Sequence, residues 1–346
     1  MKNSWLYSLP ACSSMTLTSA TGRPYWFRTC DIETDLKKEG AHIARGEKGK
    51  PLMLSGKKAE TIMFSFVGIT YNKEDSWLLD GMNEVGLTGG LLMLPEATSA
   101  EEAKEGYEGC MGMELVTRLL ALCRNVDEVK EAAKGLQILN VPHEGTSVSA
   151  AMHYFFVDEQ GNEVVLEAAD KSNPGILQIY EKEEVIGVMT NAPVYSRQLE
   201  NLSWFISQSP EFRQGLEGKP IDQLLFDGRK VKADSGAGHL SLNGTFPGSY
   251  SSHDRFIRLA VFKALNDCGN RFSDERMLAQ GNNIMSTVWE PASLGLFHYS
   301  HIDAQGNVVG QKESFTQYLV MYDLYNKKLH VRSMDSVEWS CHGLTI

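Results

Sequence analysis

The chain has 346 residues, of which 42% are hydrophobic and 22% are charged. This globular balance allows a sizeable core, built as one large domain or two ordinary ones. The formal net charge of −11 argues against a nucleic-acid binder, which needs a basic face, and weakly against docking on an anionic membrane. No stretch approaches the roughly 20 apolar residues of a membrane helix. Six cysteines without a CxxC pair indicate reduced thiols, so we expect a cytoplasmic protein.

The first third of the chain predicts strands and turns. CSSMTLTS (12–19) and PYWFRTCD (24–31), joined by the turn TGRP, favour an N-terminal hairpin. Residues 32–60 are charged and contain glycine, which predicts a surface loop with one short strand. Three β-rich runs with glycine breaks follow: TIMFSFVGITY (61–71), SWLLDGMNE (76–84) and VGLTGGLLML (85–94).

Helical periodicity first appears at 112–135, where Leu115, Leu119, Leu120 and Cys123 fall on one face. Strands return in AAMHYFFVDEQGNEVVLEAAD, two runs around a tight turn, and ILQIYEKEEVIGVMT adds another pair. The remaining segments alternate in type: helices at 196–207, 254–267 and 274–285, then hairpin strands within 297–310 and 316–334. This order lacks regular βαβ alternation. It predicts antiparallel sheets with helices packed on them, in one compact α+β domain.

Common catalytic and metal-binding motifs are missing from the sequence. GxSxG, HExxH, the P-loop and GxGxxG are absent. His298 and His301, with Asp303 nearby, would point to opposite faces of a strand, which opposes a shared metal. His253 in SSHDRF is either a candidate base or an ordinary turn histidine. We expect no metal and no cofactor.

Cys12, in SLPACSSM, is open to three interpretations: a lipid anchor, a small buried residue, or a nucleophile that becomes the first residue of the mature chain. The apolar run before it, WLYSL, is shorter than the roughly 7–15 residues of an export signal, which weakens the lipid-anchor interpretation. The predicted hairpin would return Arg28 and Asp31 close to Cys12. A cation there would favour the thiolate, and a carboxylate could hold an ammonium group. Arg28 and Asp31 could equally form an ordinary surface salt bridge.

A free α-amine on Cys12 would change its chemistry. Its unperturbed pKa of about 7.7–8.0 suits a general base at neutral pH. One residue would then supply both the nucleophile and the base.

Four segments together resemble the choloylglycine hydrolase family, the N-terminal nucleophile hydrolases that include conjugated bile salt hydrolases and penicillin V acylases. CSSMTLTSATGRPYWFRTCD is similar to the start of that family, with Arg-x-x-Asp after the hairpin. DGMNEVGLTGG (80–90), MTNAP (189–193) and FPGSYSSHDRFIR (246–258) resemble its later segments, in the family order.

The resemblance implies a four-layer αββα sandwich, usually assembled as a homotetramer. It implies that residues 1–11 are a propeptide removed on maturation and that residues 12–346 form a single domain. Cys12 would be the nucleophile and Arg28 would lie beside its thiolate. Asp31 would hold the α-amine.

The resemblance also assigns residues from the later segments. Asn191 would donate its side-chain amide to the oxyanion hole, and Arg255 would complete the polar network around the cysteine. An N–H donor at an oxyanion can contribute about 10²–10³ in rate. Without the resemblance, Asn191 would be a turn residue in T-N-A-P and Arg255 a surface arginine, although a cation opening a helix opposes the helix dipole.

Two positions depart from the family pattern. Bile salt hydrolases have an asparagine after the second segment and penicillin V acylases tend to have a tyrosine, whereas this chain has Met93, or Leu92 if the register slips. Neither side chain can donate, although the backbone N–H of Met93 still could. Cys30 lies where the family commonly has an apolar residue. We interpret it as a small core residue rather than an accessory thiol.

The sequence therefore predicts a cysteine amidohydrolase that cleaves linear C–N amide bonds of small N-acyl compounds with an apolar acyl group, as penicillin V acylases do. Conjugated bile salt hydrolysis is the alternative substrate class. A non-catalytic homologue, whose uncleaved leader blocks the amine, is the alternative outside enzymes.

Overall fold

The computed structural model describes residues 11–33, 35–54, 60–73, 77–141, 151–181, 183–207, 223–226, 229–232, 247–268, 271–293, 298–302 and 308–344. Most of the expected leader, residues 1–10, lies outside the described residues, as does Asp303.

Two antiparallel sheets form the centre of the molecule. The six-stranded sheet has the order β14 (Val188–Met189), β1 (Ala11–Thr18), β2 (Pro24–Ile32), β19 (Phe315–Asp323), β20 (Lys328–Ser333), β21 (Ser340–Gly343). The seven-stranded sheet has the order β13 (Gln178–Glu181), β12 (Glu163–Glu167), β11 (Met152–Val157), β8 (Thr88–Met93), β7 (Leu78–Asn83), β6 (Phe66–Thr70), β3 (Ile43–Gly46).

Smaller strand pairs lie outside these sheets: β9 (Glu108–Met111) with β10 (Leu136–Leu139), β4 (Pro51–Leu52) with β5 (Glu60–Thr61), β15 (Gln223–Phe226) with β16 (Arg229–Lys232), and β17 (His298–Ile302) with β18 (Val308–Glu313). The α-helices are α1 (Leu36–Glu39), α2 (Leu115–Leu122), α3 (Val126–Lys134), α4 (Tyr195–Ser207), α6 (Ser252–Asp267) and α7 (Met277–Met285). The 3₁₀ turns are η1 (Gly112–Glu114), η3 (Asp274–Arg276) and η4 (Ser286–Val288).

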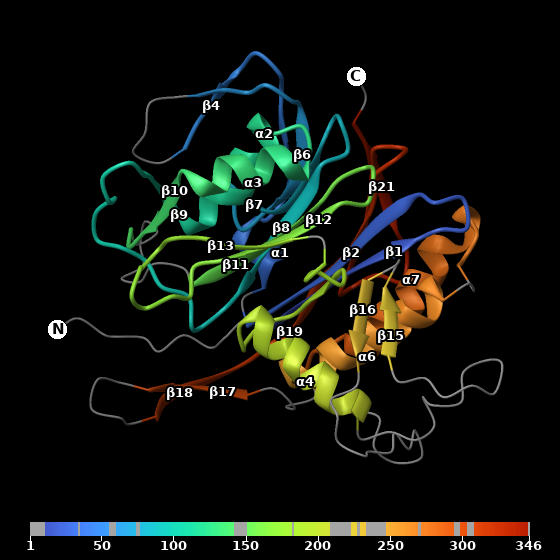
Figure 1. Cartoon of the computed structure of the whole chain (residues 1–346). Coiled ribbons are helices and arrows are strands. Elements are labelled where there is room, and N and C mark those ends of the chain that lie inside the picture. The colour runs from blue at the N-terminus through green and yellow to red at the C-terminus, as the bar shows by residue number, and fades with distance from the viewer. Residues whose placement is uncertain are drawn as a thin grey trace.

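The layers follow the order helix, sheet, sheet, helix (Figure 1). Helices α2 and α3 pack on the seven-stranded sheet through β7, β8 and β12, whereas α6 and α7 pack on β1, β2 and β19 of the six-stranded sheet. The two sheets face each other, and β1 lies against β8. The α+β prediction and its four-layer αββα arrangement are confirmed.

A glycine of the seven-stranded sheet faces a tryptophan of the six-stranded sheet. A Cβ atom added to Gly90 in β8 would lie 2.6 Å from the ring of Trp26 in β2 and 3.2 Å from Cβ of Asp80. Glycine is therefore required for this contact. Strands β1 and β2 lie between the seven-stranded sheet and helices α6 and α7. Every residue of the two strands is buried, so their polar residues need partners inside the protein.

The predicted N-terminal hairpin is confirmed, with Ser14 opposite Arg28. The predictions for two other segments need correction. Residues 112–135 do not form one helix, because the chain breaks after α2 and the side chain of Asn125 accepts from the N–H of Glu128 to begin α3. Residues 32–60 are more than a loop, since α1 forms there and β3 pairs with β6 as the edge of the seven-stranded sheet.

The strands predicted within 176–190 exist but do not pair with each other. β13 pairs with β12 in the seven-stranded sheet, and β14 pairs with β1 in the six-stranded sheet. The chain therefore crosses between the two sheets here, immediately before the segment that contains Asn191. The predicted C-terminal hairpins β17–β18 and β19–β20 are confirmed.

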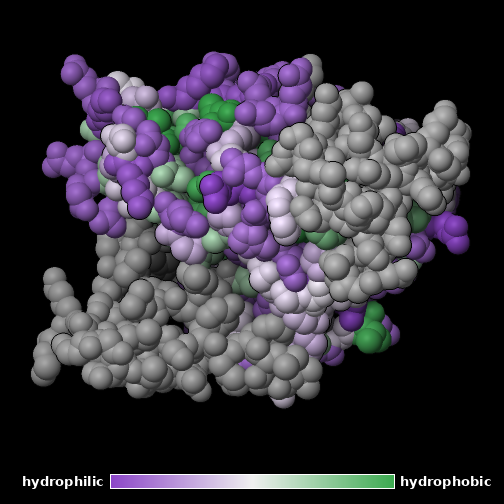
Figure 2. Space-filling model, turned by 60° about the horizontal axis from the view of Figure 1, so that its bottom comes forward, coloured by the Kyte–Doolittle hydropathy of each residue, from purple (hydrophilic) through white to green (hydrophobic). Residues whose placement is uncertain are grey.

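The described surface seen in Figure 2 is mainly hydrophilic, with hydrophobic residues in small separate groups. None of the helices in the described ranges is long and apolar enough to cross a membrane.

Candidate active site

The hairpin places Cys12 and Arg28 together in the interior. Cys12 is 3% exposed, and Arg28 Nη2 donates to its Sγ across 3.4 Å. Both side chains lie on one face of the six-stranded sheet, because Cys12 lies opposite Cys30 and Arg28 is two residues from Cys30. The cation predicted beside the thiol is therefore present.

Arg28 is held by a ring of buried polar groups. Its Nη1 forms an ion pair with Asp80 in β7 and donates to the hydroxyl of Tyr318 across 2.6 Å. Tyr318 and Tyr322, both in β19, donate to the two carboxylate oxygens of Asp80 at 2.6 and 2.5 Å. Nη2 also donates to the carbonyl of Leu91 at 3.0 Å. These contacts fix the guanidinium so that one N–H faces Cys12.

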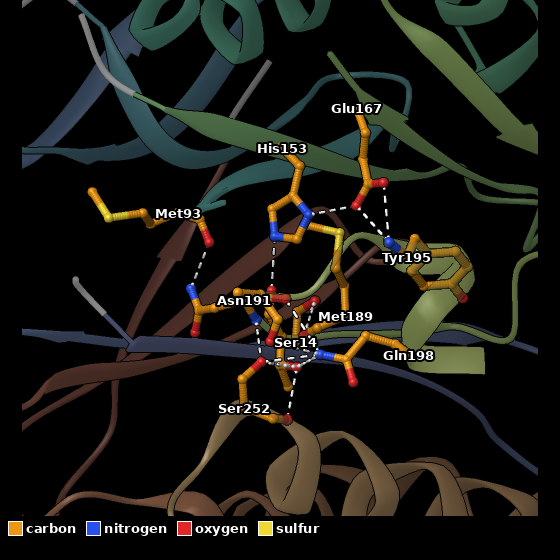
Figure 3. Close-up of polar contacts among 11 residues, drawn as sticks. Ser14, Met93, His153, Glu167, Met189, Asn191, Tyr195, Gln198 and Ser252 are labelled. Carbon is orange, nitrogen blue, oxygen red and sulfur yellow. Dashed lines mark hydrogen bonds and ion pairs between the residues drawn. The ribbon is translucent and has the colours of Figure 1, made fainter. Parts of the chain in front are cut away.

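Asn191 contacts both the backbone of Cys12 and the seven-stranded sheet. The N–H of Cys12 donates to Asn191 Oδ1 across 2.7 Å. Asn191 Nδ2 donates to the carbonyl of Met93 across 2.9 Å (Figure 3). The residues proposed for the oxyanion hole thus lie side by side, next to Cys12.

Arg255 reaches the same group from the first turn of α6. Its Nη1 donates to the carbonyl of Cys12 at 2.7 Å and to Ser13 Oγ at 2.6 Å. Its Nη2 donates to Asn191 Oδ1 at 2.9 Å. With 2% of its surface exposed, Arg255 is not a surface arginine. Its contacts offset an unfavourable position at the positive end of the helix dipole.

Asp31 lies opposite Ala11 in the hairpin and is fully buried. Its carboxylate accepts from Thr29 Oγ1 at 3.0 Å and from Thr316 Oγ1 at 2.5 Å. Burial, and the nearby charge of Glu290, raise the pKa of Asp31 well above its usual range. In the same way burial raises the pKa of Glu290 to about 6. A positive charge placed beside these two carboxyl groups would be strongly favoured.

Several contacts act together on the Cys12 thiol. A hydrogen bond from the Cys30 thiol, the charge of Arg28 and a backbone hydrogen bond from Asp31 outweigh burial and lower the pKa of Cys12 to about 6. Because this value lies below neutral pH, the thiolate predominates at pH 7.

Sequence reasoning did not assign the groups that support Arg28. Asp80 is in the quoted segment DGMNEVGLTGG, and the spacing of Tyr318 and Tyr322 puts both on one face of a strand. Neither the segment nor the spacing reveals that these side chains contact Arg28, because Asp80 lies in the other sheet from Arg28 and the two tyrosines.

The histidines considered from the sequence lie elsewhere. His253 is in the first turn of α6, where Arg255 is the side chain that reaches Cys12. His298 and His301 lie in β17, outside the two main sheets. No cluster of three or more His, Cys, Asp or Glu residues suited to a metal ion occurs in the described ranges.

Comparisons with known proteins relate the whole chain to one family. A family model described as "Linear amide C-N hydrolases, choloylglycine hydrolase family" matches residues 12–341. A bile salt hydrolase/transferase of Clostridium perfringens is 28% identical over 260 residues, 73% of this chain and 71% of that protein. A conjugated bile acid hydrolase of Lactobacillus acidophilus is 23% identical over 96% of both chains.

Solved structures show the same fold. A mutant of the conjugated bile acid hydrolase from Clostridium perfringens superposes with a TM-score of 0.73, at 21% identity over 96% of this chain and 92% of that one. Penicillin V acylase from Agrobacterium tumefaciens gives a TM-score of 0.67, at 18% identity over 96% and 86%.

The family match covers nearly the whole chain, and the fold is the one its members have. The protein therefore belongs to the choloylglycine hydrolase family and is a linear amide C–N hydrolase.

Proposed function

We propose that the nucleophile is Cys12, in a mature chain from which residues 1–11 have been removed. The observation that carries the proposal is the convergence on Cys12 of Arg28 at its sulfur, Asn191 at its nitrogen and Arg255 at its carbonyl. The family match, which begins at residue 12, supports the same boundary.

Cleavage before Cys12 would convert its amide N–H into an amine. That nitrogen already faces Asn191 Oδ1, and the carboxyl groups of Asp31 and Glu290 lie near enough to Cys12 for its thiolate charge to help raise the pKa of both. An ammonium form of the amine would therefore be stabilised, and its neutral form could take a proton from the reaction.

The reaction then proceeds through an acyl-enzyme. The thiolate attacks the acyl carbonyl carbon, and the negative oxygen is stabilised by Asn191 Nδ2 and the backbone N–H of Met93. The α-ammonium group of Cys12 transfers a proton to the leaving amine as the C–N bond breaks, and becomes the neutral α-amine. Water, deprotonated by the same amine, then releases the acid from Cys12.

We propose as substrates small N-acyl amides with an apolar acyl group, of the kind that penicillin V acylases cleave. Met93 is not the asparagine of bile salt hydrolases, which weighs against a dedicated bile salt hydrolase, although its side chain also lacks the hydroxyl of the tyrosine that penicillin V acylases tend to have. Conjugated bile salt hydrolysis is the second candidate, and the two bile acid hydrolases with 28% and 23% identity favour it.

Purified protein assayed against penicillin V, glycocholate and taurocholate tests this choice. Fastest turnover of penicillin V would support the first candidate. Turnover of the bile salts alone would establish the second.

A third possibility is a catalytically inactive homologue that keeps its leader and binds the same ligands. Absence of turnover with all three compounds, together with an intact leader, would establish it.

We also propose that the enzyme works in the cytoplasm as a homotetramer. The cysteines support the compartment, since none of the six, all of which are described, forms a disulfide. The tetramer is the assembly that the family resemblance implies. Light scattering on the purified protein would measure the number of chains per particle.

A further inference from the structure

His153 lies beside the loop that carries Asn191 but contacts neither Cys12 nor Arg28 through any hydrogen bond found in the described residues. It is in β11, opposite Glu167 in β12, and 1% of its surface is exposed. Its Nδ1 lies 2.9 Å from Glu167 Oε1, and its Nε2 lies 2.8 Å from the carbonyl oxygen of Thr190 (Figure 3).

These two contacts determine where the protons are. A carbonyl oxygen can only accept, so His153 Nε2 must carry a proton. Nδ1 and the carboxyl oxygen of Glu167 also need a proton between them, because two lone pairs at this distance would repel each other. Glu167 further accepts from the backbone N–H of Tyr195 at 3.0 Å through both oxygens. The pair therefore holds one shared proton and is neutral overall, which suits its burial.

The hydrogen bond from His153 to Thr190 joins the two sheets beside the catalytic cysteine. Thr190 directly follows β14 of the six-stranded sheet, and its neighbour Asn191 donates to Met93 in β8 of the seven-stranded sheet. β11, which carries His153, pairs with β8, and Met152 lies opposite Met93. The strand pair β8–β11 therefore carries His153, which binds the loop at Thr190, and Met93, which Asn191 must reach.

Two polar side chains hold the loop from the opposite side. Ser252 Oγ accepts from the backbone N–H of Asn191 at 2.9 Å, and Gln198 Nε2 donates to the carbonyls of Asn191 and Ala192 at 3.3 and 3.1 Å. These contacts come from α6 and α4, which lie on the six-stranded side (Figures 1 and 3). Among the side-chain hydrogen bonds found for the backbone of Thr190 and Asn191 in the described residues, only that of His153 comes from the seven-stranded sheet.

We propose that His153 is a positioning residue for the oxyanion hole, acting through Thr190 to set the distance between Asn191 and the backbone of Met93. The inference rests on the oxyanion role proposed above for Asn191. The loop must keep Asn191 Nδ2 aimed at an oxygen that forms only during the reaction. A small displacement of such a donor lowers the rate of the chemical step more than substrate affinity.

Substitution by residues of different reach tests the proposal. H153L removes both donors, and H153N can occupy the Nδ1 position but does not reach Thr190. H153Q can place an N–H near the Nε2 position. We expect kcat to fall about 10-fold or more in H153L and H153N with KM within about twofold, and H153Q to stay within a few-fold of the native enzyme.

A double-mutant cycle with N191A separates positioning from a general structural role. If His153 acts through Asn191, H153L adds little to the loss already caused by N191A, because the donor it positions is gone. Equal defects in H153Q and H153L, or losses that multiply in the double variant, would overturn the inference and leave the proposed function intact. Full activity of N191A would instead overturn the oxyanion role itself.

Cys30 supports a second, independent inference about the nucleophile. Cys12 and Cys30 are direct cross-strand partners, and both thiols are free and buried. Because the N–H of Cys12 faces Asn191 rather than β2, the two cysteines form a non-hydrogen-bonded pair, whose Cα atoms lie about 4.5 Å apart in antiparallel sheets. Disulfides span Cα separations of about 4.4–6.8 Å.

We propose that hydrogen peroxide converts Cys12 and Cys30 into a reversible disulfide that inactivates the enzyme and protects its nucleophile. The Cys12 thiolate attacks one peroxide oxygen, the O–O bond breaks, and hydroxide leaves, giving a sulfenic acid. The sulfur of Cys30 then attacks the Cys12 sulfur, the S–O bond breaks, and the Cys30 proton departs with the hydroxyl group as water. Two thiols are oxidised and one peroxide is reduced. A dithiol reverses the reaction by exchange.

Peroxide treatment followed by intact-mass analysis tests this inference without relying on activity. The native protein should lose the mass of two hydrogens, yield a peptide pair linked through Cys12 and Cys30, and recover activity with dithiothreitol. After the same peroxide treatment, C30A should gain oxygen atoms on Cys12 and should not recover activity with dithiothreitol. C123A, which removes another buried thiol, should behave like the native protein. If the native protein also gains oxygen on Cys12 and loses activity irreversibly, as expected for C30A, the inference would be overturned.

Discussion

Side chains from several distant parts of the chain surround Cys12. Arg28 follows it in the hairpin, Asn191 is 179 residues away, and Arg255 is 243 residues away. Each of the three contacts a different atom of the same residue. A cysteine that was only a small core residue would not have its sulfur, nitrogen and carbonyl oxygen all bound by buried polar groups.

Replacing the nucleophile should abolish the reaction while leaving the fold. We expect C12A to lower kcat by roughly 10⁴-fold or more, and C12S to retain little activity because a hydroxyl is a poor nucleophile without a strong base. Initial rates with the best substrate from the panel measure this. C110A, which removes a different buried thiol, serves as the control. Full amidase activity in C12A would rule out the proposed nucleophile.

Arg28 should contribute to the acidity of the Cys12 thiol, together with the hydrogen bond from Cys30. The charge of Arg28 is among the causes that lower the pKa of Cys12 to about 6, so the thiolate forms as the pH rises through about 6. In R28Q this charge is lost and the pKa should rise, so that less thiolate is present at pH 7 and activity falls at neutral pH. The ultraviolet absorbance of the thiolate as a function of pH, with C12A subtracted, measures the shift.

R197Q provides a matched control, because Arg197 is exposed on α4 and its guanidinium is paired only with Glu200 among the ion pairs found in the described residues. An unchanged thiol titration in R28Q would show that the guanidinium does not set the pKa of Cys12.

The residues at the site could be predicted to different degrees. Cys12 and Arg28 are close in sequence, so a hairpin was enough to bring them together. Asn191 and Arg255 were assigned only through the family resemblance, because nothing local distinguishes them from a turn residue and a helix-start arginine. Asp80, Glu290 and His153 act through contacts between different layers, which no local pattern reports.

At the scale of elements, α7 packs on β2 through a helical glycine. A Cβ atom at Gly281 would lie 2.1 Å from the ring of Phe27. In an open helix position, replacing glycine by alanine would stabilise the protein by about 1 kcal/mol. Here we expect G281A to destabilise it by roughly 1–3 kcal/mol because the core becomes overpacked.

Thermal or urea unfolding measures the effect of G281A, and F27L provides the control. The smaller side chain makes room, so G281A should cost less in the F27L background than in the native protein. A G281A variant as stable as the native protein would show that the helix can shift away from β2.

The errors in predicted elements also have physical causes. The helical pattern of 112–135 continues across Cys123–Asn125, because hydrophobic periodicity does not register a break when the next helix keeps its apolar face toward the same sheet. The strands β13 and β14 each match the β pattern. Their assignment to different sheets depends on tertiary pairing, and a strand sequence does not contain that information.

At the scale of the whole molecule, the α+β class and the antiparallel sheets followed from the order of strands and helices. The stacking of two sheets between two helical layers did not, because fully buried strands such as β1 and β2 contain serine, threonine, arginine and aspartate. Because such polar residues are usually exposed, the sequence does not indicate that both faces of these strands are buried. Some of these polar residues also build the candidate site. The residues that form the site are therefore the ones that make the strands look exposed in the sequence.

The central claim is that the mature enzyme begins at Cys12, and intact-mass measurement of the purified, active protein tests it most directly. Activity should be associated with a chain whose mass and N-terminal sequence begin at Cys12, and the C12A variant should keep its leader if the thiol takes part in the cleavage. A fully active protein that retains residues 1–11 would contradict the account, because Cys12 would then have no α-amine to act as the base.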